Sequence, residues 1–194
     1  MPEVFIISGA NGSGKTTTAK QILPHFLGIY EYVNADEIAA GLSPFSPESV
    51  AIQAGKLMLK RLDYLCQNQI NFALETTLSG LNYLRFLARC KERNYQINLI
   101  YFWLNSPQLA ITRVKQRVAS GGHNIPKDTI IRRYYRGQKN LVESYLPLCD
   151  TWIIYDNSSL PSQLIATYSQ GENLSIYQAQ IWSNIQEINH ESST

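Results

Sequence analysis

Short apolar runs alternate along most of the chain with longer segments of helical periodicity. The runs that have the length and the Val, Ile, Phe and Tyr content of β-strands are residues 4–7, 29–33, 70–74, 97–104 and 152–155. Amphipathic patterns between them predict helices over residues 15–23, 47–67, 83–93, 106–119 and 126–145. Because strands that alternate with helices form a parallel sheet covered on both faces, the sequence predicts an α/β fold with a parallel five-stranded sheet.

The C-terminal part of the chain has a different pattern. Residues 164–168 and 174–177 flank the turn-forming segment 170–173 and predict a hairpin, which a helix to about residue 188 follows. There is no internal repeat, no low-complexity segment and no linker. We therefore expect a single domain over residues 1–194.

The composition is that of one globular domain, since 44% of the 194 residues are hydrophobic and the formal net charge is only +2. This balance does not call for nucleic acid or an anionic membrane as a partner. Cys66, Cys90 and Cys149 form no C-x-x-C pair and are expected to be reduced core thiols. Without a signal-like segment or an apolar stretch of membrane-spanning length, the expected compartment is the cytoplasm.

A phosphate-binding loop follows the first predicted strand. Residues 9–16 match the pattern G-x-x-x-x-G-K-[ST] at every fixed position, in the required strand-to-helix context. In such loops glycines let the backbone wrap around phosphate oxygens, Lys15 faces the β- and γ-phosphates, and Thr16 offers a hydroxyl to Mg²⁺. The predicted nucleotide-binding residues are Gly9, Ala10, Asn11, Gly12, Ser13, Gly14, Lys15, Thr16 and Thr17.

The remaining motifs argue against two other classes of phosphate-loop protein. Regulatory GTPases carry an N-K-x-D segment that reads guanine, and this sequence has none. Transporter-type ATPases need an apolar strand that ends in Asp-Glu, whereas residues 97–104 are followed by Asn105. The segment 120–123, S-G-G-H, is similar to a transporter signature but lacks its companion motifs.

Two carboxylates follow predicted strands at the edge of the sheet where α/β proteins bind ligands. Asp36 lies just after the second strand and Glu75 just after the third. A kinase needs a carboxylate that takes the proton of the acceptor hydroxyl, and Asp36 is our candidate base, with Glu75 as the second carboxylate. Either residue could instead cap a helix, and Glu37 is expected only to complement a helix dipole.

A basic segment, residues 113–139, holds eight Lys or Arg residues and one acid, a local net charge of 8 − 1 = +7. Its two helical patterns are joined at Gly121-Gly122, an arrangement suited to a hinged lid over a triphosphate. The candidate phosphate contacts are Arg117, Arg133 and Arg136. His123, beside the glycine pair, is a candidate contact to a phosphate or a sugar, and the alternative is a histidine that caps the turn or is simply exposed.

The basic segment is also consistent with roles that involve no phosphate. Some of its charges are expected simply to solvate helix faces. Tyr134 and Tyr135 stand among the arginines as stacking platforms in a nucleic-acid groove would, although their spacing from Ile130 and Ile131 also fits a buried stripe.

Six motifs in order give the chain a family resemblance. The motifs are G-A-N-G-S-G-K-T-T (9–17), N-A-D-E (34–37), E-T-T-L-S-G (75–80), G-G-H-N-I-P (121–126), R-R-Y-Y-R-G (132–137) and Y-D-N-S-S (155–159). With this ordered set, the chain resembles the zeta toxin-like P-loop kinases over residues 4–160.

The resemblance implies an adenylate-kinase-like sheet, Asp36 as the base, Glu75 and Thr77 as residues that hold the acceptor, and lid arginines on the phosphates. Characterised zeta toxins phosphorylate a UDP-linked amino sugar, and an antitoxin protein blocks their nucleotide site. The glycine-histidine lid of this sequence differs from the arginine pair of the characterised toxins.

Together these features predict a kinase that transfers a phosphoryl group from ATP, with Mg²⁺, to a small molecule. The acceptor would bind among Asn34, Asp36, Glu75, Thr77 and His123, with a UDP-sugar as the leading acceptor. The alternative is a nucleotide-gated ATPase or regulatory protein that contacts RNA through the basic segment.

Overall fold

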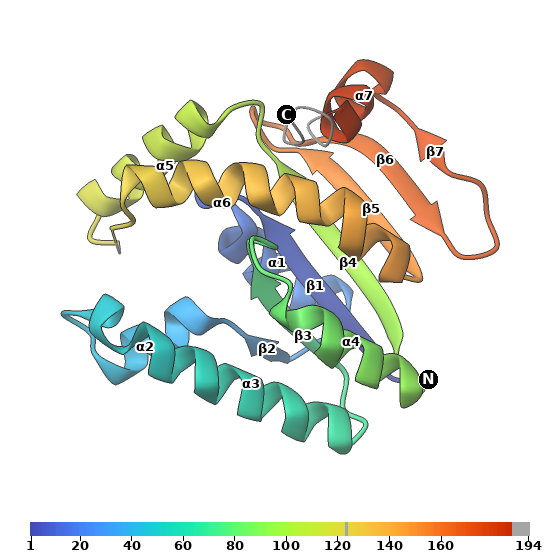
Figure 1. The fold of residues 1–194 in the computed structure, drawn as a ribbon, viewed down its shortest axis with the longest axis horizontal. Coiled ribbons are helices and arrows are strands. Elements are labelled where there is room, and N and C mark those ends of the chain that lie inside the picture. The colour runs from blue at the N-terminus through green and yellow to red at the C-terminus, as the bar shows by residue number, and fades with distance from the viewer. Residues whose placement is uncertain (123, 188–194) are drawn as a thin grey trace.

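The computed structural model describes residues 1–122 and 124–187. Its centre is a sheet in the order β2-β3-β1-β4-β5-β6-β7, shown in Figure 1. The first five strands in sequence are parallel, as predicted: β1 (Glu3–Gly9), β2 (Glu31–Val33), β3 (Phe72–Thr76), β4 (Gln96–Trp103) and β5 (Thr151–Asp156).

Over residues 1–122 and 124–187 the sheet has seven strands rather than the expected five. The predicted C-terminal hairpin forms β6 (Gln163–Ser169) and β7 (Ser175–Ile176), and β6 pairs antiparallel with β5. The hairpin therefore extends the main sheet at one edge. The indole of Trp182, from the following helix α7 (Ala179–Glu187), stacks on Trp152 at 5.5 Å between ring centroids and secures this edge.

The helices follow the predicted pattern with revised ends. The connection between β2 and β3 contains two helices. It begins with α2 (Ala35–Leu42), continues through a 3₁₀ turn at Pro47–Val50 and ends with α3. A π-helical turn at Leu141–Tyr145 continues α6, so the predicted helix 126–145 is not α-helical throughout. The remaining helices are α1 (Lys15–Phe26), α3 (Ala51–Gln67), α4 (Asn82–Glu92), α5 (Pro107–Ala119) and α6 (Lys127–Asn140).

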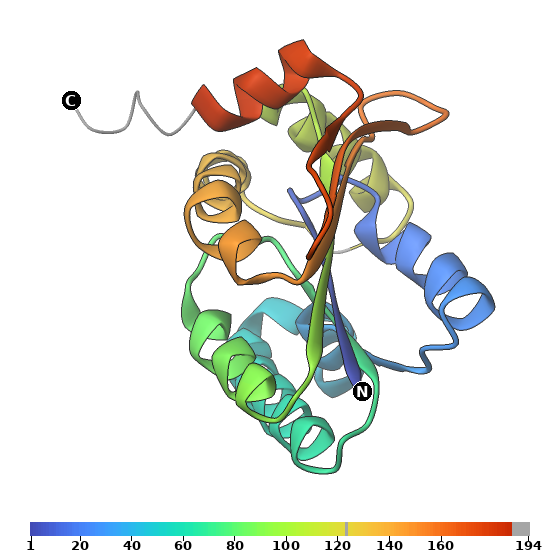
Figure 2. The ribbon, with the colours of Figure 1, turned by 90° about the vertical axis from the view of Figure 1, so that its right-hand side faces the viewer.

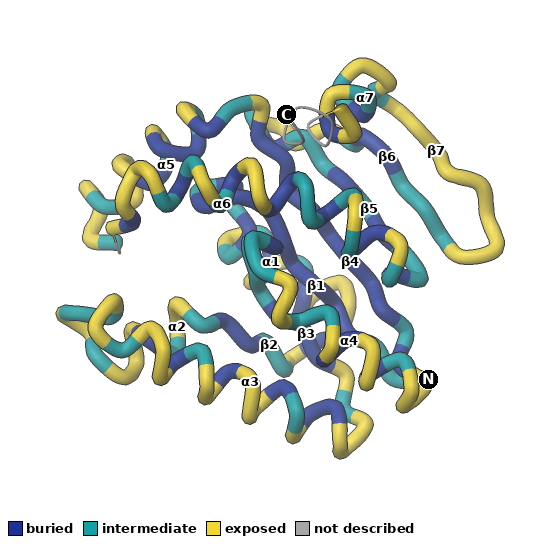
Figure 3. Tube along the Cα trace, in the orientation of Figure 1, coloured by how far each residue is buried: buried dark blue, intermediate teal, exposed yellow. Residues whose placement is uncertain are grey.

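The sheet has a core on each face, because neighbouring residues of a strand point to opposite faces. Ile6 and Leu99 belong to the large core beneath α3, α4 and α7, while Ile7 and Ile100 belong to the smaller core beneath α1. Figure 2 shows the sheet edge-on between these helical layers, and Figure 3 shows the buried strands inside the exposed outer faces of the helices. Cys66, Cys90 and Cys149 are buried free thiols, as expected.

A third core attaches α5 and α6 to the end of the sheet that carries the phosphate loop. Val114 of α5 and Ile130 and Tyr134 of α6 are buried against Ala10 and Leu104. The Tyr134 hydroxyl also donates to the Leu104 carbonyl oxygen at 2.6 Å. Tyr134 thus belongs to a buried stripe, one of the two roles that the sequence allowed for it.

The described residues include no helix long and apolar enough to cross a membrane.

The close contact between α6 and the loop after β3 predicts a large effect of one added methyl group. In Gly137→Ala the new Cβ would lie 2.3 Å from the Thr77 carbonyl oxygen, so α6 or the loop must shift. We expect a loss of about 1–3 kcal/mol in the free energy of unfolding, measured by urea denaturation.

The matched control is Gly55→Ala in α3, where an added Cβ meets no atom within 4 Å. There alanine should raise stability by up to about 1 kcal/mol through its higher helix propensity. A Gly137→Ala protein as stable as the parent would contradict the close packing of α6 on this loop.

Candidate active site

The phosphate loop has a backbone that only glycine readily adopts. Gly9 and Gly14 have φ angles of 142° and 87°. A Cβ on Gly9 would lie 2.4 Å from the Phe102 carbonyl oxygen. Helix α1 starts after Gly14 with no side-chain cap, so its first N–H groups are oriented for an anion, as in phosphate-binding helix termini.

Asn157, just after β5, fastens this loop from across the sheet. Its side-chain Nδ2 donates to the Ser13 carbonyl oxygen at 2.6 Å, and its backbone N–H donates to the Trp103 carbonyl oxygen at 2.9 Å. The Arg113 guanidinium of α5 donates to the Asn157 and Ser158 carbonyl oxygens at 2.7 and 2.9 Å. The motif Y-D-N-S-S (155–159) includes Asn157, but the sequence did not predict its contact with Ser13, because the two residues are 144 positions apart.

Lys15 is almost completely buried at the start of α1. Its Nζ donates to the Ala10 carbonyl oxygen at 2.8 Å and lies 3.9 Å from Glu75 Oε1. Burial lowers the pKa of Lys15, and the charges of Glu75 and Asp36 oppose this effect. The positive charges of Arg117 and Arg133 lower the same pKa further, which places both arginines within electrostatic reach of Lys15.

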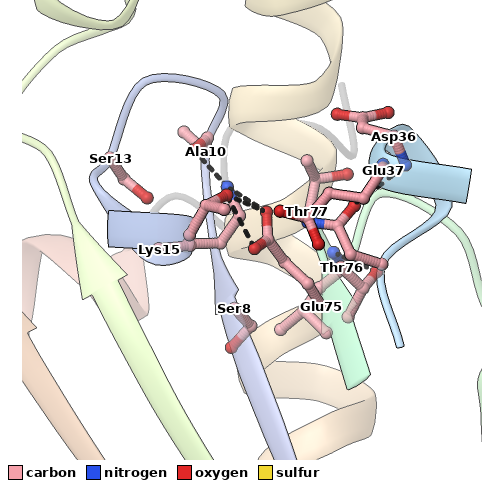
Figure 4. A network of polar contacts seen from close by, with 12 residues as sticks. Ser8, Ala10, Ser13, Lys15, Asp36, Glu37, Glu75, Thr76 and Thr77 are labelled. Atoms are coloured by element: carbon pink, nitrogen blue, oxygen red, sulfur yellow. Dashed lines mark hydrogen bonds and ion pairs between the residues drawn. The ribbon is translucent and has the colours of Figure 1, made fainter. Parts of the chain in front are cut away.

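Glu75 lies between the phosphate loop and the start of α2, as Figure 4 shows. The Thr16 hydroxyl is 2.8 Å from Glu75 Oε2 and 3.1 Å from Oε1, and the Tyr32 hydroxyl also donates to Oε2. In the β1–β3 register Glu75 pairs with Ile7, close to the beginning of the loop. Glu75 is therefore a shared acceptor at the loop rather than a helix cap.

Asp36 is an exposed residue in the first turn of α2. The cap of that helix is Asn34, whose Oδ1 accepts from the backbone N–H groups of Asp36 and Glu37 at 2.8 and 3.4 Å. Asp36 is therefore not the cap of α2, and its carboxylate is available for chemistry. The neighbouring Glu37 forms an ion pair with Lys20 at 2.7 Å.

A cavity of about 190 Å³ joins these elements. Its polar walls combine residues of the phosphate loop, α2, the end of β3 and α6. Ser79 and Tyr83 belong to it and were not predicted. The lining residues are Asn11, Lys15, Asn34, Ala35, Asp36, Glu75, Thr76, Thr77, Ser79, Tyr83 and Arg133.

A larger hollow, of about 420 Å³, lies elsewhere, lined by residues such as Lys91, Gln96 and Asp150. Gln96 begins β4 and Asp150 precedes β5, so this hollow is at the amino ends of the strands. The residues of the phosphate loop do not line it. Ligand chemistry is therefore better placed in the smaller cavity.

The arginines of the predicted lid differ in position. Arg133 lines the cavity, whereas Arg117 and Arg136 are exposed and not among its lining residues. His123 lies outside the described residues. Closure of residues 113–139 stays a prediction, and the buried anchors of α5 and α6 limit the parts that could move.

The oxygen donors at the loop suit ATP and Mg²⁺. Thr16 and Glu75 provide the hard oxygen atoms that Mg²⁺ prefers, and phosphates and water usually complete its shell. In the part of the chain that the structure describes, no cluster of three or more His, Cys, Asp or Glu residues could hold a metal alone. If Mg²⁺ binds with the nucleotide, Thr16 would be the residue that holds it, with Glu75 beside it.

The family model that matches residues 1–161 is that of the Zeta toxin. The chain belongs to the Zeta toxin family. It is also 32% identical, over 132 residues, to an uncharacterized protein of Haemophilus influenzae, a match that covers 65% of this chain and 88% of that protein.

Solved structures of low sequence identity share the fold. The AvrRxo1-ORF1:ORF2 complex with ATP matches at a TM-score of 0.76 and 17% identity, over 95% of this chain and 63% of that chain. This chain thus spans less than two thirds of that relative. A structure from the PezAT toxin–antitoxin system of Streptococcus pneumoniae matches at a TM-score of 0.64 and 17% identity, over 98% and 85% of the two chains.

The Asn157 contacts predict that a residue outside the phosphate loop supports nucleotide binding. Asn157→Ala removes the donor to the Ser13 carbonyl oxygen and leaves the loop less restrained. Because a lost buried hydrogen bond costs about 1–3 kcal/mol, we expect calorimetry to show a several-fold or greater loss of ADP affinity. Asn173→Ala, at an exposed position between β6 and β7, is the control and should bind like the parent. Unchanged ADP affinity in Asn157→Ala would refute the restraint.

Proposed function

We propose that this protein transfers the γ-phosphoryl group of ATP to a hydroxyl of a small molecule. The observation that carries the proposal is the shared cavity, in which Lys15 of the phosphate loop faces the same space as Asp36. One wall fits a nucleotide phosphate and the other offers a candidate base. Membership of the Zeta toxin family supports the same reaction.

The transfer step assigns a role to each group. Asp36 takes the proton of the acceptor hydroxyl while that oxygen attacks the γ-phosphorus. The bond from the γ-phosphorus to the bridging oxygen breaks, and ADP leaves with the bond's electron pair. Lys15 and Arg133 offset the negative charge of the phosphates, and Arg117 and Arg136 would add to this if residues 113–139 close. Bound Mg²⁺ would neutralise charge on the β- and γ-oxygens.

The proposed acceptor is a nucleotide sugar such as a UDP-sugar. The cavity supports a polyhydroxylated acceptor, because Asn34, Thr77 and Ser79 provide amide and hydroxyl groups close to Asp36. The Thr77 and Ser79 hydroxyls lie 2.9 Å apart and can each rotate to donate or accept. A cytoplasmic location would supply both ATP and such acceptors.

We also propose that a protein antitoxin binds this chain. Two of the structures that share its fold come from a toxin–antitoxin system and from an AvrRxo1 ORF1:ORF2 complex. Co-purification with the product of a neighbouring reading frame would test this part of the proposal.

The direct test is an assay of purified protein with Mg-ATP and a panel of UDP-sugars, free sugars and nucleosides. ADP release that depends on one acceptor class, with a phosphorylated product identified by mass spectrometry, is the expected result. Release of inorganic phosphate alone, at a rate that no acceptor changes, would overturn the proposal.

Asp36→Asn is expected to separate chemistry from binding. The amide keeps the size of the side chain but cannot take a proton, so turnover should fall by about two to four powers of ten. ATP affinity should change little. Glu37→Gln, at the exposed neighbouring position, is the control and should retain turnover. An Asp36→Asn protein with normal turnover would exclude Asp36 as the base.

Two adjacent arginines of α6 allow a matched test of whether a positive charge at the cavity speeds phosphate transfer. Arg133 lines the cavity, whereas Arg132 does not. Arg133→Ala should lower turnover by about 10²- to 10³-fold if its charge stabilises the transition state, with a smaller effect on ATP affinity. Arg132→Ala should stay near the parent value. Equal effects of the two substitutions would mean that α6 acts only through its general positive charge.

A further inference from the structure

A chain of hydrogen bonds connects the start of α2 to the phosphate loop through Tyr32, a residue that no motif includes. Asn34 Nδ2 donates to the Tyr32 hydroxyl at 3.2 Å. The Tyr32 hydroxyl donates to Glu75, and Glu75 accepts from Thr16. The pleat of the sheet explains how Tyr32 reaches Glu75. Tyr32 pairs with Ala73, and Glu75 lies two residues further along β3 on the same face.

The chemistry of the groups fixes the direction of each bond. An ionised carboxylate only accepts, so both hydroxyls must donate to Glu75. The Tyr32 oxygen then accepts from the Asn34 amide, whose own oxygen is occupied by the cap of α2. Burial and the Glu75 charge raise the pKa of Tyr32, so the phenol keeps the proton that it donates.

The same logic applies to Thr16. A hydroxyl has one proton, and here that proton points to Glu75. The lone pairs of the Thr16 oxygen are therefore left for a cation on its other side. Glu75 can orient Thr16 in this way only while its own carboxylate stays in place.

We propose that Tyr32 is a positioning residue that holds Glu75 against Thr16 and so sets the affinity of the nucleotide site for Mg²⁺. The inference rests on the proposed function, because it assigns Thr16 to Mg²⁺ at a nucleotide site. Tyr32 has few ways to move, since its ring packs on the core of Phe5 and Ile7. Its link to Asn34 also ties Glu75 to the helix that carries Asp36.

The test measures ADP binding by calorimetry with saturating Mg²⁺ and with EDTA. Tyr32→Phe keeps the ring in the core and removes only the hydroxyl. It should weaken ADP binding roughly tenfold in Mg²⁺, the cost of one lost hydrogen bond to a charged group, and leave binding in EDTA unchanged. Tyr30→Phe is the matched control, because Tyr30 is 81% exposed, and it should behave like the parent.

A second variant shows whether Tyr32 acts through Glu75. In a Glu75→Ala background Tyr32→Phe should have no further effect, because the group it positions is gone. Equal losses with and without Mg²⁺, or a further loss in that background, would overturn the positioning role.

The binding readout separates this inference from the kinase proposal. Mg²⁺-linked binding that responds to Tyr32→Phe as expected, in a protein that transfers no phosphate, would overturn the kinase alone. A parent protein that binds ADP equally with and without Mg²⁺ would overturn the role of Tyr32 while leaving phosphate transfer to be judged by its own assay.

Discussion

The buried positive charge of Lys15 is the constraint on which the rest of the site depends. An ammonium group that has lost its water needs negative partners nearby, and the Ala10 carbonyl oxygen and Glu75 supply them at 2.8 and 3.9 Å. Glu75 can do so because β3 lies beside β1 in the sheet. The strand order that places these two residues together also brings Thr16, Tyr32 and Asn34 to the same edge.

The loop that presents Lys15 is held from two sides. Asn157, which Arg113 of α5 holds in turn, restrains the loop from the end of β5, and the Glu75 network restrains the first turn of α1. A rigid phosphate site costs less to organise when the ligand binds. The opposite wall of the cavity carries the exposed Asp36 and the half-buried Ser79, whose polar groups suit it to the acceptor.

Much of the fold and part of the site could be predicted from the sequence. The five parallel strands and the phosphate loop have strong local signals, and strand ends at one edge placed Asp36 and Glu75 in the same region. What local pattern could not give is pairing between distant residues. Three contacts are of this kind: the pairing of β6 with β5, the hydrogen bond from Asn157 to the phosphate loop, and the hydrogen bond from Tyr32 to Glu75.

The basic segment shows the limit of reasoning from charge. Its composition predicted phosphate contacts but did not rank the arginines, because position relative to the cavity depends on how α6 packs. The buried Tyr134 and the contact at Gly137 set that packing, and they turn Arg133 rather than Arg136 toward the cavity. His123 falls outside the described residues, so its predicted contact remains a prediction.

The most direct test of the proposed phosphotransfer is the fate of the γ-phosphoryl group, followed by phosphorus NMR in a mixture of the protein, Mg-ATP and UDP-sugars. We expect a new phosphomonoester resonance that grows in step with ADP, with little inorganic phosphate. ADP that appears only together with inorganic phosphate, or ATP that persists unchanged with active, folded protein, would contradict phosphotransfer to such an acceptor.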